Sequence, residues 1–193
     1  MLNNGHLEPA ITISLGPNDI YARFAEKLNK ELTMEIFKEW GEMGFLGADI
    51  PEEYGGQGLP MTYMGLVLEE AGRVLAPVPL HSTMVAALAI ADAGNEAQRF
   101  EILPAVASGG MVLTWALTER NPKLVPEALV QEAATEGDGW VLSGEKMFVE
   151  NFNVAQKCLV VVRTAPASPR NQGISLFLID PNGTGVSQTP LIT

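Results

Sequence analysis

The sequence predicts an α+β protein in which a helical half precedes a β-rich half. In the first half, apolar residues recur every four positions from Ile20 to Trp40, which is the spacing of one helix face and not the alternation of a strand. In the second half, short apolar and β-branched runs are separated by turns rich in glycine, proline and asparagine. Strands and helices do not alternate, which disfavours a Rossmann-type domain. We therefore expect a tail at residues 1–18, a helical domain at 19–110 and a β domain at 111–193.

The first helical stretch covers residues 19–43. Asn18 is a candidate cap for its start. Thr33 could cap a second helix, so a break in the helix is expected near Glu31. Gly44 stands where a left-handed C-terminal cap is favoured.

Three further helices are expected before the β half, each beginning at a residue whose side chain can cap a helix. The expected spans are Thr62 to about Leu75, Ser82 to Gly94, and Asn95 to an interruption at Pro104. Between the first and second helices, residues 44–60 are rich in glycine and proline, which predicts a loop.

Strands are expected wherever β-favouring residues cluster between turn signals. The expected strands are residues 111–117, 140–142, 159–162 and 174–179. The expected turns are residues 137–139, 143–144, 168–171 and 181–183.

Composition excludes several function classes. The chain has 193 residues, of which 47% are apolar and 18% charged, so it can bury a sizeable core. Its net charge of −11 repels phosphate backbones and anionic headgroups, which makes nucleic acid and membrane surfaces poor partners. The longest apolar run, residues 84–91, is far shorter than the roughly 20 residues that span a bilayer.

The single cysteine and the N-terminal sequence indicate a reducing compartment. Cys158 cannot form an internal disulfide, and its apolar neighbours favour a buried strand cysteine over a nucleophile. The N-terminus lacks the basic and apolar regions of a signal peptide. We expect a soluble, intracellular protein, located in the cytoplasm.

Local motifs identify no chemistry by themselves. The two histidines, His6 and His81, have no partner at metal-ligand spacing. The glycines of residues 55–58 follow a helix and a loop, so they indicate a tight turn more than a phosphate cradle. Trp115 and Phe148 are either core residues or rings that face a flat cofactor. From residues alone, the chain is a soluble acidic α+β protein that could hold a flat ligand at its β domain.

Five segments, taken together and in order, resemble the acyl-CoA dehydrogenase family. They are residues 40–58, 68–73, 103–109, 116–119 and 142–149. The resemblance covers roughly residues 19–193. It implies an all-helical N-terminal domain followed by an antiparallel, β-barrel-like middle domain, truncated before the C-terminal helices of the family.

The resemblance also implies FAD as the cofactor, with its ring system against the β domain. The implied reaction, typical of fatty acid metabolism, removes two hydrogens from an acyl-CoA thioester: a base takes the α-proton and the flavin accepts the β-hydride. The implied partners are an acyl-CoA substrate, an electron-transfer flavoprotein or a similar acceptor, and further subunits in a homo- or hetero-oligomer. The residues implied to contact FAD are Trp115, Leu117, Thr118, Phe148, Val149 and Glu150.

Two stretches depart from the family pattern. After Glu119 the family usually continues with proline, small residues and Ser-Asp, whereas residues 120–126 here are bulkier and include two prolines. Where many members have Trp-Ile-Thr, this chain has Phe148, Val149 and Glu150. The hydroxyl of that third residue normally donates toward the flavin, and an ionised glutamate accepts hydrogen bonds but cannot donate them.

The chain ends at Thr193, where the resemblance implies more of the β domain and then a helical bundle that carries the catalytic glutamate. We expect no catalytic residue in this chain and no acyl-CoA dehydrogenation by the chain alone. Glu119, or the loop carboxylates Asp49, Glu52 and Glu53, are poor candidates for the base.

Two functional hypotheses remain at this point. The first is a flavoenzyme subunit of the acyl-CoA dehydrogenase type. The alternative is a non-catalytic partner subunit that keeps the fold in a hetero-oligomer, which Glu150 and residues 120–126 favour. An uncovered strand edge after residue 193 is also expected to promote self-association.

Overall fold

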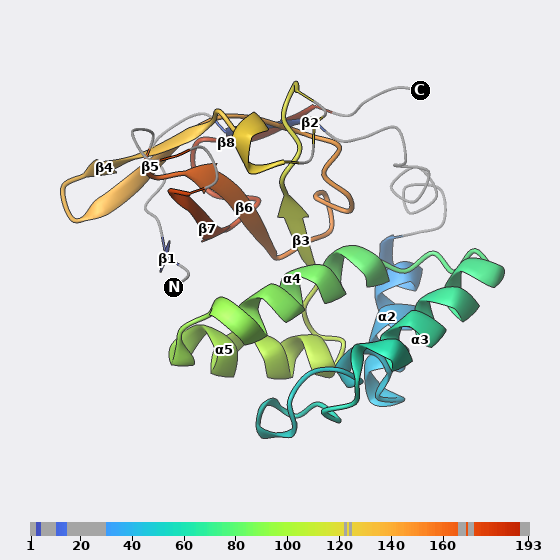
Figure 1. Cartoon of the computed structure of the whole chain (residues 1–193). Coiled ribbons are helices and arrows are strands. Elements are labelled where there is room, and N and C mark those ends of the chain that lie inside the picture. Colours follow the sequence, from blue (N-terminus) through green and yellow to red (C-terminus); the bar gives the residue numbers. More distant parts are fainter. Residues whose placement is uncertain are drawn as a thin grey trace. The chain divides into compact units, whose positions relative to one another are not determined.

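Helices occupy the first half of the chain and strands occupy most of the second (Figure 1). The computed structural model describes residues 3–4, 11–14, 30–121, 123, 125–165, 169 and 172–189. These residues form two units. The helical unit comprises residues 30–113 and 154–156, and the β unit comprises residues 3–4, 11–14, 114–153 and the described residues from 157 onward.

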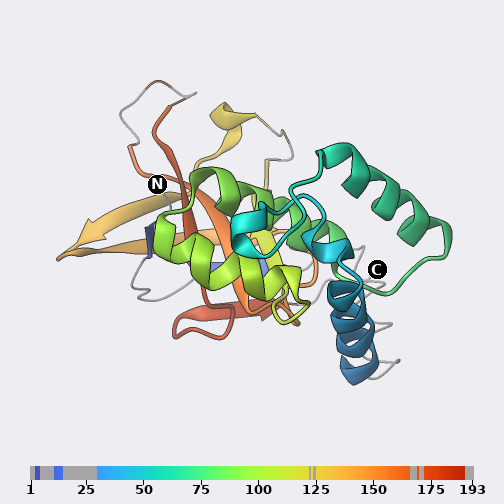
Figure 2. The ribbon, with the colours of Figure 1, turned by 90° about the horizontal axis from the view of Figure 1, so that it is seen from below.

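The helical unit contains four α-helices and two short 3₁₀ turns within the described residues. They are α2 (Lys30–Glu42), η1 (Phe45–Gly47), η2 (Glu52–Tyr54), α3 (Met61–Arg73), α4 (Leu80–Ala93) and α5 (Glu96–Ala107). Helices α4 and α5 lie side by side, as the views in Figure 1 and Figure 2 agree. The core is apolar and includes Phe37, Leu46, Met64, Leu80 and Met84, all buried.

Two of the predicted helix ends are confirmed. Gly44 adopts the left-handed conformation at φ 83° after α2. Asn95 begins α5 through a capping box: the Asn95 side chain accepts from the Gln98 N–H at 2.8 Å, and the Gln98 side chain accepts from the Asn95 N–H at 3.0 Å.

Other helix predictions are wrong, and prolines explain most of them. Helices α3 and α4 begin directly after Pro60 and Pro79 and not at Thr62 and Ser82, because a proline is readily accommodated at a helix start. Pro104 lies inside α5 without interrupting it, near the end of that helix.

The start of the first helix is only partly tested. Helix α2 runs through Glu31 and Thr33 without the predicted break. The proposed cap Asn18 lies outside the described residues, as does His6.

Gly41 allows α2 to approach the end of α5 closely. A Cβ atom at Gly41 would lie 2.3 Å from the backbone nitrogen of Gly109. We expect Gly41→Ala to lower the free energy of unfolding by about 1–3 kcal/mol, because the backbone must shift to admit a methyl group. Gly65→Ala on α3, which points into open space, is the matched control and is expected to stabilise by about 0.5–1 kcal/mol. Urea denaturation measures both, and equal effects would contradict the close approach.

The β unit is built on one mixed sheet. Its strands are β1 (Asn3–Asn4), β2 (Ile11–Ser14), β3 (Leu113–Ala116), β4 (Glu132–Glu136), β5 (Gly139–Met147), β6 (Lys157–Arg163), β7 (Ile174–Ile179) and β8 (Val186–Thr189), with the turn η3 (Pro126–Ala128). The strand order is β1-β7-β6-β4-β5-β2-β8, and β3 pairs with β6. The pairs β4–β5 and β6–β7 are antiparallel.

The antiparallel, barrel-like form expected for this domain is not confirmed, because the sheet is mixed and not closed. Strand β1 pairs parallel with β7, and β2 pairs parallel with β5 and β8. Both strands come from residues 1–18, for which the sequence predicted only a tail. Strands that are not joined by a hairpin turn are free to pair in parallel, which explains why the turn pattern did not predict this arrangement.

The core of the β unit lies on strands β5, β6 and β7. Leu142, Val160 and Phe177 are fully or almost fully buried, and Trp140 contacts Phe177 edge-on at a centroid distance of 5.6 Å. Cys158 is fully buried on β6, as predicted. Burial raises the pKa of the Cys158 thiol, so it stays protonated and a poor nucleophile.

Strand prediction succeeded where the residues are apolar. The turn predicted at residues 137–139 is present as the β4–β5 connection at residues 137–138, and β7 matches its predicted bounds. The predicted turn at residues 143–144 is wrong, since both residues lie inside β5. The polar strands β4 and β8 were not predicted, because their sequences carry no apolar alternation. Among the described helices, none is both long enough and apolar enough to cross a membrane.

Candidate functional site

Two segments of the β unit lie next to each other and carry the predicted site residues. The first is β3 with the residues that follow it, and the second is the end of β5 with the residues that follow it. The Met147 N–H donates to the Thr118 carbonyl at 2.8 Å. The Thr114 hydroxyl donates to the Glu150 carbonyl at 2.5 Å. These two contacts bring the segment of Trp115, Leu117 and Thr118 alongside the segment that carries Phe148 to Glu150.

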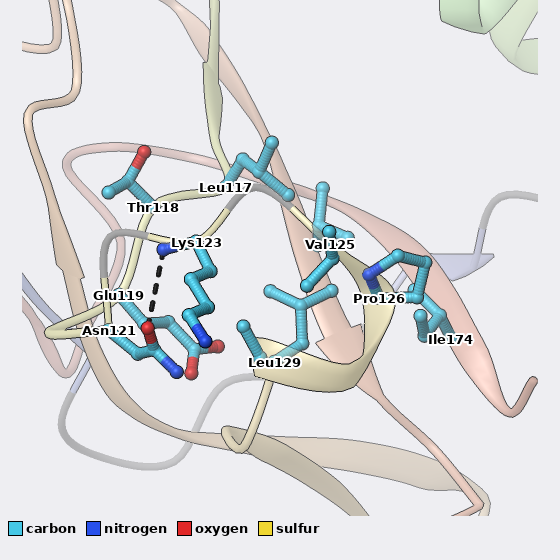
Figure 3. Close-up of a pocket in the computed structure, with 11 residues that line it drawn as sticks. Leu117, Thr118, Glu119, Asn121, Lys123, Val125, Pro126, Leu129 and Ile174 are labelled. Carbon is cyan, nitrogen blue, oxygen red and sulfur yellow. Dashed lines mark hydrogen bonds between the residues drawn. The ribbon is translucent and has the colours of Figure 1, made fainter. Parts of the chain in front are cut away.

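A cavity of about 300 Å³ opens beside the first segment (Figure 3). Leu117 and Thr118 line it, together with Val125, Leu129 and Ile174. Figure 3 shows Val125 and Ile174 on one side of the cavity and the polar side chains of Thr118 and Asn121 on the other. The cavity can therefore take a mostly apolar group that has a polar edge.

The second segment contains an unusual backbone conformation. Phe148 has a φ of 58° and Asn151 a φ of 55°, both in the left-handed region. For a bulky residue such as Phe148 this costs on the order of 1–3 kcal/mol, and such strain is found most often at functional sites. Phe148 is 46% exposed.

The other predicted site residues differ from one another in how exposed they are. Val149 is 1% exposed and packs in the core, which holds the strained segment in place. Trp115 is half-buried on β3, and Glu150 is exposed. The cavity lining includes Leu117 and Thr118 from the six predicted residues, and the other four lie beyond it.

A buried ion pair joins the two segments. Lys146 on β5 is fully buried, and its Nζ lies 2.7 Å from Oε1 of Glu119. The same Nζ donates to the Leu117 carbonyl at 3.3 Å. The Glu119 carboxylate also accepts from the Val130 N–H at 2.8 Å and from the Gln131 N–H at 3.3 Å. Each charge is thus compensated by its partner and by further hydrogen bonds, which a buried pair needs.

Desolvation is the largest influence on the pKa of Lys146 in this pair. Burial lowers the pKa of the Lys146 ammonium, and the hydrogen bond and charge of Glu119 act in the opposite direction. Because its carboxylate oxygens are engaged by Lys146 and by backbone N–H groups, Glu119 is poorly placed to abstract a proton from a substrate.

A buried arginine donates hydrogen bonds to backbone carbonyls of the cavity wall. Arg163 at the end of β6 donates to three carbonyls: those of Leu129 at 3.2 Å, Gln172 at 2.8 Å and Pro126 at 3.0 Å. Pro126 and Leu129 both line the cavity. Sequence reasoning missed Arg163 and the role of Lys146, because an isolated basic residue at a strand end does not reveal which carbonyls or carboxylates it contacts.

The loop carboxylates lie in the helical unit. Glu52 and Glu53 are exposed on η2. Both carboxylate oxygens of Asp49 are buried, and desolvation raises the pKa of that carboxyl. Across the described residues, no group of three or more His, Cys, Asp or Glu side chains could hold a metal ion.

Comparisons with protein families match almost the whole chain. Residues 18–110 match "Acyl-CoA dehydrogenase, N-terminal domain", and residues 114–193 match "Acyl-CoA dehydrogenase, middle domain". The protein is 33% identical over 172 residues to acyl-CoA dehydrogenase FadE12 of Mycobacterium tuberculosis, which corresponds to 87% of this chain and 44% of that protein.

Solved structures give the same result. An acyl-CoA dehydrogenase of Bacillus anthracis complexed with FAD superposes with a TM-score of 0.70 at 29% identity, over 92% of this chain and 31% of that one. The ChsE4–ChsE5 complex of Mycobacterium tuberculosis gives a TM-score of 0.67 at 26% identity, over 84% of this chain and 45% of that one. The chain spans less than half the length of each of these three proteins.

Proposed function

Because the chain belongs to the acyl-CoA dehydrogenase family, we propose that it takes part in the FAD-dependent α,β-dehydrogenation of an acyl-CoA thioester. The observation that carries the proposal is the cavity at Leu117 and Thr118, whose segment lies alongside the one that carries the strained, exposed Phe148. We propose that this surface of the β unit is the face against which the flavin ring lies. The domain bounds 19–110 and 111–193 are part of the same proposal.

The residues present fit a flavin ring. The cavity has a largely apolar lining for the ring faces and polar groups, including the Thr118 hydroxyl, for its edge. Its volume of about 300 Å³ is at the lower end of the range for ligand pockets, roughly 300–1,000 Å³. It therefore suits the ring system, and the rest of a dinucleotide would have to lie outside it.

Bound FAD would supply the hydride acceptor. The chain's own residues would bind and orient it: Leu117 and Trp115 by apolar contact, Thr118 through its hydroxyl, and Phe148 through its exposed ring. Val149 would act indirectly, because it anchors the segment in the core. We assign no residue of this chain the role of catalytic base, and the inactivity of the chain alone stays a prediction.

A second function remains a candidate because of Glu150. An ionised carboxylate at this position cannot donate a hydrogen bond to the flavin and would oppose negative charge on it. A non-catalytic subunit in a hetero-oligomer would tolerate such a residue, and one structural neighbour is a complex of two differently named proteins. In either case we propose an oligomer, with an acyl-CoA substrate and an electron-transfer flavoprotein or similar acceptor as partners.

Thr118→Val is expected to weaken FAD binding about two- to ten-fold and to leave the fold intact. Valine keeps the shape of threonine but removes the hydroxyl at the cavity edge, and a lost hydrogen bond to a bound group is worth about 0.5–1.5 kcal/mol. Equilibrium dialysis with FAD measures the change. Thr135→Val, at an exposed position on β4, is the matched control and is expected to bind FAD as the unsubstituted protein does. Unchanged binding in Thr118→Val would count against Thr118 as a flavin contact.

The dehydrogenation is tested on protein that is expressed from the whole gene and loaded with FAD. Acyl-CoA thioesters of different chain lengths are added to it. Loss of flavin absorbance on addition, in the absence of oxygen, is the result the proposal expects. A flavin that stays oxidised with every chain length would favour the non-catalytic function.

A further inference from the structure

We propose that Glu119 and Lys146 are positioning residues, whose buried ion pair closes the segment 120–129 and thereby holds Leu117 and Thr118 in their binding position. The identity of the ligand rests on the function proposed above. The closing of the segment does not, because it follows from contacts within the β unit.

The ion pair fixes both ends of segment 120–129. At its start, Lys146 donates to the Leu117 carbonyl and binds the Glu119 carboxylate. At its end, the same carboxylate accepts from the backbone N–H groups of Val130 and Gln131. One buried carboxylate therefore bridges the two ends of the segment, and Lys146 ties that carboxylate to β5.

The described residues of the segment so closed form much of the cavity wall. Asn121, Val125 and Leu129 line the cavity from within it, and Leu117 and Thr118 line the cavity immediately before it (Figure 3). If the ends separate, the wall moves away from Thr118, and the cavity loses its shape. The ion pair thus acts on a bound ring through the residues that touch it.

An adjacent ion pair provides a matched control. Arg120 and Glu145 each lie one residue from the buried pair and are joined at 3.0 Å, so they connect the same two segments. The Arg120 side chain is 85% exposed, however, and solvent weakens its attraction to Glu145. The two pairs therefore differ in burial and in the backbone N–H groups that bind the Glu119 carboxylate.

The test compares two double variants. In Glu119→Gln/Lys146→Met both buried charges are removed together, with little change of shape, so that no uncompensated charge is left inside. In Arg120→Met/Glu145→Gln the exposed pair is removed in the same way. The measurements are the FAD dissociation constant, the visible circular dichroism of bound FAD, and the hydrogen exchange rates of the Val130 and Gln131 amides by NMR.

We expect the buried-pair variant to bind FAD at least ten-fold more weakly, to change the circular dichroism of the bound flavin, and to exchange both amides at least three-fold faster. The exposed-pair variant should change none of these by more than two-fold. A folded buried-pair variant with either unchanged FAD affinity or unchanged exchange would overturn the inference.

The inference can also be tested if the double variant does not fold or if the unsubstituted protein does not bind FAD. If the double variant does not fold, Glu119→Asp keeps the charge but shortens its reach, and the same changes are expected at smaller size; unchanged values would again overturn the inference. If the unsubstituted protein binds no FAD, the proposed function fails. The amide exchange rates then decide alone whether the pair closes the segment.

Discussion

Replacing Glu119 by glutamine is expected to lower the free energy of unfolding by about 3–5 kcal/mol near neutral pH, because the fully buried Lys146 ammonium then has no counter-charge. The neighbouring Glu145→Gln, which breaks the pair with the largely exposed Arg120, is the control and should cost less than about 1 kcal/mol. Urea denaturation of both variants gives the comparison.

The loss of unfolding free energy in Glu119→Gln should depend on pH. The direction of this dependence follows from the titration of Lys146. Burial already lowers the pKa of Lys146 below its ordinary value of 10.5, and the variant loses the carboxylate that opposed this shift. Between the folded and the unfolded pKa, the unfolded chain holds more protons, so stability rises with pH. The penalty is thus fully present below the folded pKa and is relieved as pH rises through it. A loss below about 1 kcal/mol that does not vary with pH would contradict the buried pair.

Arg163→Met is expected to cost about 3 kcal/mol and to loosen the cavity wall. It removes three hydrogen bonds from a charged donor to the carbonyls of Pro126, Leu129 and Gln172, each worth roughly 1.5–3 kcal/mol before relaxation. Arg163→Lys should lose most of the same stability, since an ammonium cannot reproduce the planar fork of a guanidinium.

Arg73→Met serves as the control for Arg163, because Arg73 is an exposed arginine paired with Glu70 on α3. It should change stability by less than about 1 kcal/mol. Limited proteolysis within residues 120–129 provides a second measurement, and only the Arg163 variants should be cut faster. Equal stability of the Arg163 and Arg73 variants would contradict the role given to the three carbonyl contacts.

The helical unit could be predicted well from the sequence because its signals are local. The period of four as far as it falls in α2, the left-handed Gly44 and the capping residue Asn95 each act within a few residues of the chain. The errors are also local. At α3 and α4 a capping side chain competed with a proline two or three residues earlier, and the helix began after the proline.

The sheet and the cavity depend on contacts between distant residues, and pattern alone could not supply them. Apolar β7 was found within its bounds, whereas polar β4 was missed, and the parallel pairing of β2 with β5 has no sequence signal. Glu119 and Lys146 are 27 positions apart and look like ordinary surface charges in the sequence. The segment that contains Leu117 and Thr118 was located by resemblance, and only the structure shows it beside a cavity.

If the segments around Thr118 and Phe148 form a flavin-binding face, the protein should retain FAD. The visible absorption spectrum after incubation with FAD and removal of the unbound cofactor measures this. We expect a retained yellow chromophore with flavin bands, present at about one FAD per site and reduced in Thr118→Val. A folded protein that retains no flavin under these conditions would show that these segments do not bind the cofactor.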